Sequence, residues 1–181
     1  MRERVAGFLH KAGALGAVMQ LRKLVPMPTL SIVTYHHVAD QTPGYPFDPD
    51  IADASSAQFR RHMEILARYG TPISVSDLLR AIEGGSLPKN PVMVTFDDGY
   101  RSCHDIALPI LRRVGVPATF FISTSFITER RLYWWERVSL LLTAARRERG
   151  TITYPRPLEL ELRDPGLRDR LNGIIKTQLS L

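Results

Sequence analysis

Apolar residues in this chain fall into short runs that are bounded by turn-forming residues. Runs of this kind predict buried strands at 30–35, 91–94 and 118–122. Between the last two runs, apolar positions at helical spacing predict a helix over 106–114, which Pro109 bends or restarts. A strand, a helix and a strand at this spacing predict parallel pairing with a right-handed crossover. The pattern therefore indicates an α/β fold.

Two further helices are predicted from their capping residues. One helix should begin at Ser55 or Ser56, either of which can cap it, and Gly70 should end it. The motif Ser74-x-x-Asp77 has the spacing of a capping box and predicts the start of the next helix. A short strand is expected just before that motif, around Ile73.

The rest of the chain is divided between loops and a mixed C-terminal part. Residues 39–54 are rich in proline and predict a long loop above a strand end, which often forms the wall of a functional site. A helix is expected over 134–145, and a small hairpin over 151–154 and 158–162. A last helix is expected over 164–178.

Composition and charge limit the class of protein. The 181 residues suffice for one domain with its own core, and 44% hydrophobic with 23% charged residues excludes overall disorder. A net charge of +6 is compatible with nucleic acid or an anionic membrane as a partner. The arginines are spread along the chain in pairs, however, which favours a solvated surface and argues against nucleic-acid binding. The single Cys103 excludes an internal disulfide framework and cysteine-based zinc knuckles.

The N-terminal residues 1–25 form a distinct segment with basic ends and an apolar stripe. His10 and Lys11 interrupt its apolar middle and no small-residue cleavage site follows, so it is a poor signal peptide. No apolar run is long enough to span a bilayer. An amphipathic helix is predicted, which either packs on the domain or makes peripheral membrane contact. The expected location is cytoplasmic or peripheral membrane, compatible with a bacterial envelope context.

The strongest chemical signal is the pair Asp97-Asp98, which ends the predicted strand at 91–94 and precedes Gly99. In α/β folds the loops after the carboxyl ends of strands carry the chemistry. Two neighbouring carboxylates can take different roles when their environments separate their pKa values. An Asp-Asp-Gly sequence is also a common turn, but the apolar strand before it favours a functional site.

These residues resemble the first motif of the polysaccharide deacetylases, the carbohydrate esterase family 4 that shares the NodB homology domain. The resemblance spans about residues 29–140 and includes further segments in the same order: Tyr35-His36-His37-Val38, 107–111, 115–121 and Tyr133-Trp134-Trp135. It implies a partial, incomplete distorted (β/α) barrel. It also implies that Asp97 is the catalytic base and that Asp98 is a metal ligand.

The reaction implied by this resemblance is the metal-assisted hydrolysis of an N-acetyl or O-acetyl group on a carbohydrate polymer. Zinc is the expected metal, with cobalt or nickel as alternatives. The family completes its metal site with two histidines spaced His-x-x-x-His, and no such pair exists in this chain. The later family motifs with the catalytic acid are also absent. The chain is therefore expected to be truncated before the histidine ligands, to bind metal weakly and to be inactive alone.

Other residues are candidates for a substrate wall: His36, His37, Tyr100 and Trp134. Neighbouring strand residues point in opposite directions, so at most one of the two histidines should face the cleft. Packing is the alternative role for each of these side chains, and Cys103 is expected to be a helix residue with no role as a nucleophile.

The chain is expected to divide into an amphipathic N-terminal helix over 1–28, the N-terminal part of a polysaccharide deacetylase-like domain over 29–145, and a charged insertion or tail over 146–181. Three functional interpretations follow. The first is the N-terminal part of a deacetylase, which the intact Asp97-Asp98 pair favours. The second is a non-catalytic relative that binds sugar or a partner. The third is a basic membrane- or nucleic-acid-associated module, suggested by the charge and residues 1–25.

Overall fold

The computed structural model describes residues 29–41, 45, 51–144, 149–153, 157–161, 166 and 173. It contains two compact units, one formed by Met1–Asp40 with Ala52–Ser123 and the other by Gln41–Ile51 with Thr124–Leu181. The helix expected over 1–25 lies outside the described residues. Of the helix expected over 164–178, the structure describes only Gly166 and Gly173, both of them helical. Among the described residues, no helix has both the length and the apolar character needed to cross a membrane.

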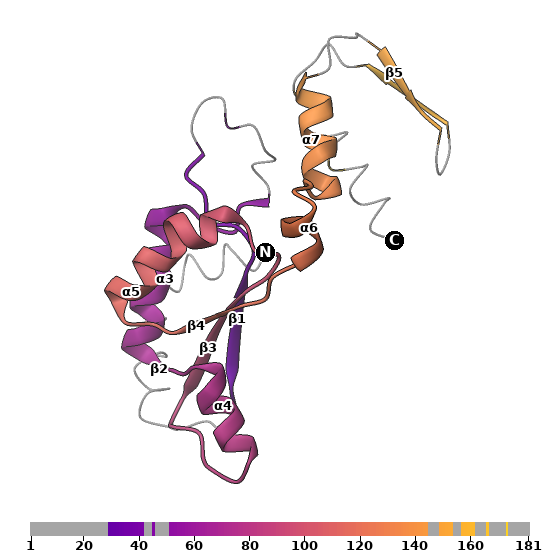
Figure 1. Ribbon diagram of the computed structural model, residues 1–181. Helices are drawn as coiled ribbons and strands as arrows, with labels where there is room; N and C mark the ends of the chain where they lie inside the picture. The colour runs from indigo at the N-terminus through magenta and orange to yellow at the C-terminus, as the bar shows by residue number, and fades with distance from the viewer. Residues whose placement is uncertain are drawn as a thin grey trace. The chain divides into compact units, whose positions relative to one another are not determined.

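The first unit is built on a parallel sheet with β3 (Pro91–Phe96) at its centre. Strand β1 (Ser31–Tyr35) pairs with β3 along its length. Strands β2 (Thr71–Pro72) and β4 (Ala118–Phe120) pair with the beginning and the end of β3, so both lie along its other edge. All six residues of β3 are buried, as expected of an apolar strand inside a parallel sheet. The predicted α/β class and parallel pairing are confirmed (Figure 1).

Two helices begin where their capping residues predict. Helix α3 (Ser56–Tyr69) has Ser55 as its N-cap, and Ser55 forms a reciprocal capping box with Gln58. Helix α4 (Val75–Ile82) begins with the predicted box between Ser74 and Asp77. These boxes satisfy backbone donors that a helix leaves unpaired at its start.

The crossover from β3 to β4 starts as a π-helix, η2 (Cys103–Ala107), and continues as α5 (Leu108–Val114). Pro109 lies in the first turn of α5, so the helix restarts there as the sequence predicts. Gly115 ends it with φ 75°, a left-handed conformation that glycine adopts without a Cβ clash.

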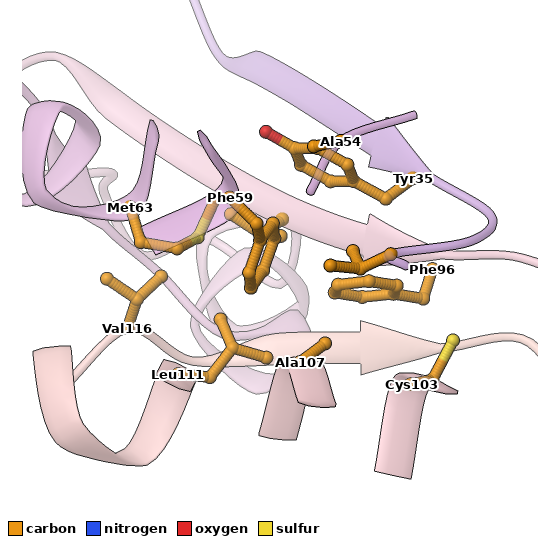
Figure 2. Close-up of a cluster of buried hydrophobic side chains, with 11 residues drawn as sticks. Tyr35, Ala54, Phe59, Met63, Phe96, Cys103, Ala107, Leu111 and Val116 are labelled. Carbon is orange, nitrogen blue, oxygen red and sulfur yellow. The ribbon is translucent and has the colours of Figure 1, made fainter. Parts of the chain in front are cut away.

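The core of the first unit lies between the sheet and the helices α3, η2 and α5. Side chains of alternate strand residues, among them Val94 and Phe96, point toward these helices. Phe59 and Met63 of α3 are fully buried against them, and Leu111 of α5 completes the cluster (Figure 2). Aromatic rings form its centre, since Phe96 lies 5.6 Å from Phe59 and 4.9 Å from Phe120 between ring centroids.

The second unit contains α6 (Thr124–Thr128), α7 (Trp134–Ala144) and an antiparallel hairpin of β5 (Arg149–Ile152) and β6 (Leu158–Glu161). The predicted helix and hairpin are thus present. Aromatic rings connect α6 to the start of α7, since the Phe126 ring lies 4.2 Å from that of Tyr133, which stacks on Trp135 at 4.7 Å between ring centroids.

Three details of the predicted strands are wrong. The strand expected over 91–94 continues to Phe96. The strand expected over 118–122 ends at Phe120, and Phe121 and Ile122 are 55% and 52% exposed. The Phe121 amide makes the last ladder hydrogen bond, to the Phe96 carbonyl at 2.7 Å, and the chain then turns away. Ile73 lies just beyond β2, although its amide still donates to the Val92 carbonyl.

A candidate hydrolytic site at the carboxyl edge of the sheet

The two adjacent carboxylates lie where the central strand ends. The Asp97 amide donates to the carbonyl of Tyr35 at 2.9 Å, which continues the ladder between β3 and β1 by one residue. Because parallel strands end at one edge of the sheet, this bond places Asp97 beside the residues that follow β1. The half-buried Asp97 and Asp98 therefore share an edge with His36 and His37.

The backbone at Asp98 is left-handed, with φ 71°, and the following Gly99 has φ 85°. Such a conformation is uncommon for a residue with a Cβ and costs about 1–3 kcal/mol. Neighbouring hydrogen bonds hold it, since the Gly99 amide donates to the Asp97 carbonyl at 2.9 Å and the Ser123 amide to the Asp98 carbonyl at 3.2 Å. Residues held in this way concentrate at functional sites.

The electrostatic environment of Asp98 makes its carboxyl harder to ionise than that of a free aspartate. Burial raises the pKa of the Asp98 carboxyl, nearby His36 opposes that rise, and the adjacent Asp97 adds to it. The two carboxylates thus interact unfavourably with each other, as expected of neighbouring acids. A cation at this edge would be attracted to both.

The two histidines have different environments, as the strand geometry predicts. The His36 side chain is 48% exposed, whereas His37 is buried. A hydrogen bond of 2.8 Å joins His37 Nδ1 and Ser102 Oγ, and the His37 ring packs on the Tyr100 ring at 4.7 Å between centroids. Burial lowers the pKa of His37, and the nearby Asp53 carboxylate partly opposes this shift. His36 is thus the histidine that is available to a substrate.

Asp53, which the sequence does not single out, also belongs to this site. Its Oδ2 accepts hydrogen bonds from the amides of His36 at 2.5 Å and His37 at 3.1 Å. The same oxygen lies 3.7 Å from His36 Nδ1. Asp53 comes from the predicted loop over 39–54, and no local pattern marks it, because only tertiary contacts bring it to the strand end.

The predicted wall residues Tyr100 and Trp134 lie in different surroundings. Tyr100 is half-buried and lies against the His37 ring, which gives it a packing role in addition to any contact with a substrate. Trp134 starts α7 in the second unit, is 36% exposed and makes an edge contact with Trp135 at 5.5 Å between ring centroids. The structure therefore brings His36, His37 and Tyr100 together with the carboxylates, and it describes Trp134 within a separate unit.

Cys103 is buried, and its Sγ donates to the His36 carbonyl at 3.4 Å. Burial raises the pKa of its thiol to about 11, with backbone hydrogen bonds opposing and nearby carboxylates adding to the shift. It therefore stays a protonated thiol at neutral pH, which fits the predicted structural role.

A metal centre requires several ligands, and the described residues do not supply one. Across the part of the chain that the structure describes, no group of three or more His, Cys, Asp or Glu side chains could hold a metal ion. Asp98 and His36 share an edge of the sheet and are residue types that zinc uses, but among the described residues no third donor completes a site with them.

Comparison with known proteins shows what the segment that carries this site is similar to. Residues 84–154 match the family model described as polysaccharide deacetylase. This match includes the Asp97-Asp98 pair, the crossover to β4, and the helices α6 and α7 of the second unit. This part of the chain is therefore similar to the polysaccharide deacetylases.

Similar curated proteins carry a more specific name. The chain is 30% identical over 90 residues to poly-beta-1,6-N-acetyl-D-glucosamine N-deacetylase of Escherichia coli K12, which covers 49% of this chain and 13% of that protein. It is 28% identical over 86 residues to the enzyme of the same name from Staphylococcus aureus MRSA252, covering 47% of this chain and 30% of that protein. The chain thus spans less than a third of the length of these relatives.

Solved structures of deacetylases are also similar. A de-N-acetylase from Aggregatibacter actinomycetemcomitans is 24% identical with a TM-score of 0.46, covering 74% of this chain and 45% of that one. A Streptococcus pyogenes deacetylase solved with acetate is 21% identical with a TM-score of 0.48, covering 64% and 53%.

Proposed function

We propose that this protein acts in the removal of N-acetyl groups from a β-1,6-linked N-acetylglucosamine polymer. The observation that carries the proposal is the arrangement of Asp97, Asp98 and the exposed His36 at one edge of the sheet. The names of the curated relatives support the N-acetyl polymer as substrate. Hydrolysis of the amide would release acetate and leave a free amine on the sugar.

Two of these residues suit the proton transfers of amide hydrolysis. The Asp97 carboxylate would take a proton from the attacking water as its oxygen bonds to the acetyl carbon. His36 would give a proton to the nitrogen as the carbon–nitrogen bond breaks, so that an amine leaves. General acid and base groups of this kind each contribute about 100- to 10,000-fold to a rate.

Asp98 remains the proposed metal ligand, and zinc the proposed metal. One carboxylate supplies a single ligand, whereas a catalytic zinc site uses about three protein ligands and keeps one position open. When bound, a divalent metal would polarise the acetyl carbonyl. The left-handed backbone of Asp98 and the charge of its neighbour support a functional role for this carboxylate.

The test is release of free amines from acetylated β-1,6-glucosamine oligomers, with added zinc, by the wild-type protein and three variants. Asp97→Asn keeps the side-chain shape and removes the base, so we expect the rate to fall by about 100-fold or more. His36→Ala should lower the rate in the same way. Asp105→Asn is the matched control, because Asp105 is an exposed acid that pairs with Arg101 and His104.

The proposal would be contradicted if the wild-type protein released amines no faster than Asp97→Asn. Measuring oligomer binding to the same proteins separates catalysis from a sugar-binding role. A catalytic Asp97 predicts that binding is kept in Asp97→Asn while turnover is lost.

A further inference from the structure

We propose that Asp53 is a positioning residue that fixes the His36 imidazole at the edge of the sheet beside Asp97. The inference rests on the proposed function, because it assigns His36 a task that requires a fixed position. Asp53 lies 44 residues before Asp97 in the chain, outside the segment that matches the family model.

The contacts of the Asp53 carboxylate are directed at the backbone of the two histidines. Oδ2 accepts from both successive amides, His36 at 2.5 Å and His37 at 3.1 Å. These amides follow the last residue of β1, where the ladder to β3 ends. One carboxylate oxygen thus accepts the two hydrogen bonds that a neighbouring strand would otherwise accept from these amides. It thereby fixes the direction in which the chain leaves the sheet. Hydrogen bonds to a charged acceptor are stronger than neutral ones.

Asp53 is itself held by backbone contacts. Its amide donates to the His37 carbonyl at 2.9 Å, and the Ala39 amide donates to the Ala54 carbonyl at 3.1 Å. Val38 and Ala54 form an isolated parallel bridge, and both are buried. The segment that carries Asp53 is therefore fastened to the segment that carries the histidines on both sides of the carboxylate.

The orientation of the two rings follows from this arrangement. The His37 ring is held in the interior by Ser102 and Tyr100. Successive side chains in extended backbone point to opposite sides, so His36 projects outward. There its Nδ1 lies 3.7 Å from Asp53 Oδ2, which favours one orientation of the imidazole.

A serine nucleophile is an alternative use of the same residues, because Ser102, His37 and Asp53 are neighbours. In a catalytic triad the acid binds the histidine ring and the histidine activates the serine. The contacts of Asp53 with His37 are with its backbone amide and carbonyl, and the His37 ring is buried. The geometry therefore favours positioning over nucleophilic catalysis.

The experiment compares Asp53→Ala and Asp53→Asn with Asp40→Ala. Asparagine keeps an oxygen that can accept from both amides, whereas alanine removes it. Asp40 is a matched control, because its Oδ1 accepts from the backbone amide of Ser56 at 2.8 Å in the same region. The measurements are kcat and KM on acetylated glucosamine oligomers, and the backbone amide proton shifts of His36 and His37 by NMR.

We expect Asp53→Ala to lower kcat by about 10- to 100-fold, since small misplacements of a catalytic group have effects of this size. KM should stay near its wild-type value. The two histidine amide shifts should move upfield. Asp53→Asn keeps a neutral acceptor for both amides and should restore most of kcat and of these shifts. Asp40→Ala should leave kcat, KM and the histidine amide shifts unchanged.

The proposal would be overturned if Asp53→Ala retained wild-type kcat while Asp97→Asn was inactive, and the proposed function would then stand. It would also be overturned if Asp53→Asn restored the amide shifts without restoring kcat, because the charge of Asp53 would then be what matters. Loss of the proposed function itself would show as an Asp97→Asn variant as active as wild type.

Discussion

Replacing Phe59 by alanine should remove more stability than any single change on the outer surface of the first unit. The Phe59 side chain is fully buried, and its ring lies 5.0 Å from the ring of Tyr35 in an edge contact and 5.6 Å from that of Phe96. Burial of such a side chain contributes about 1.5–3 kcal/mol. The remaining cavity and the lost ring contacts bring the expected loss to about 3–5 kcal/mol.

The assay is equilibrium unfolding in urea, followed by the fluorescence of the aromatic residues. With a urea dependence of about 1–3 kcal/mol per molar, the midpoint should fall by roughly 2 M. The free energy of unfolding of a domain of this size is about 5–15 kcal/mol, so the alanine variant can be partly unfolded in buffer. Phe59→Leu, which keeps most of the apolar volume, should then lower stability by about 1 kcal/mol.

Phe121→Ala is the matched control, because it removes the same side chain at a position that is 55% exposed. Its effect should lie within about 0.5 kcal/mol of zero. The reasoning would be refuted if Phe121→Ala cost as much as Phe59→Ala, since burial would then not determine the loss.

Three further predictions concern a cap, a titration and a metal. Ser55→Ala removes the acceptor for the Gln58 amide at the start of α3 and should lower the unfolding free energy by about 1 kcal/mol, measured in urea, with Ser55→Asn close to wild type. His37 has a lowered pKa in the folded protein, so the unfolded chain binds the proton first. The stability that neutral His37 contributes should be fully present above the usual histidine pKa and be lost as the pH falls below it. Urea midpoints measured from pH 7 to pH 5 should therefore decrease, and His37→Gln should make this decrease smaller. Zinc should bind only weakly, because the described residues supply fewer than the three ligands of a catalytic zinc site. Calorimetric titration should therefore show no saturable micromolar site, and a tight site that Asp98→Ala abolishes would contradict this.

Local sequence signals predict the elements whose hydrogen bonds are local. The capping boxes at Ser55 and Ser74 form as the sequence indicates, because each involves residues three positions apart. The left-handed end of α5 at Gly115 follows from the freedom of glycine. The burial of β3 follows from its apolar run, since only a strand covered on both faces is apolar throughout.

The parts that the sequence did not predict depend on distant contacts. Strand β4 ends at Phe120 because its partner β3 ends at Phe96, and the sequence around Phe121 does not indicate this. The place of Asp53 depends on the bridge between Val38 and Ala54, formed across a proline-rich loop without periodicity. The position of the Asp97-Asp98 pair at the end of β3 could be predicted, because the pair directly follows the strand in the chain.

The left-handed backbone at Asp98 has a consequence for laboratory evolution. Glycine adopts this conformation without strain, so Asp98→Gly would relieve a local cost of about 1–3 kcal/mol. A selection for heat resistance alone would therefore enrich this substitution while it removed the carboxylate. Libraries built on this chain should keep position 98 fixed, or test every selected variant for the proposed deacetylation as well as for melting temperature.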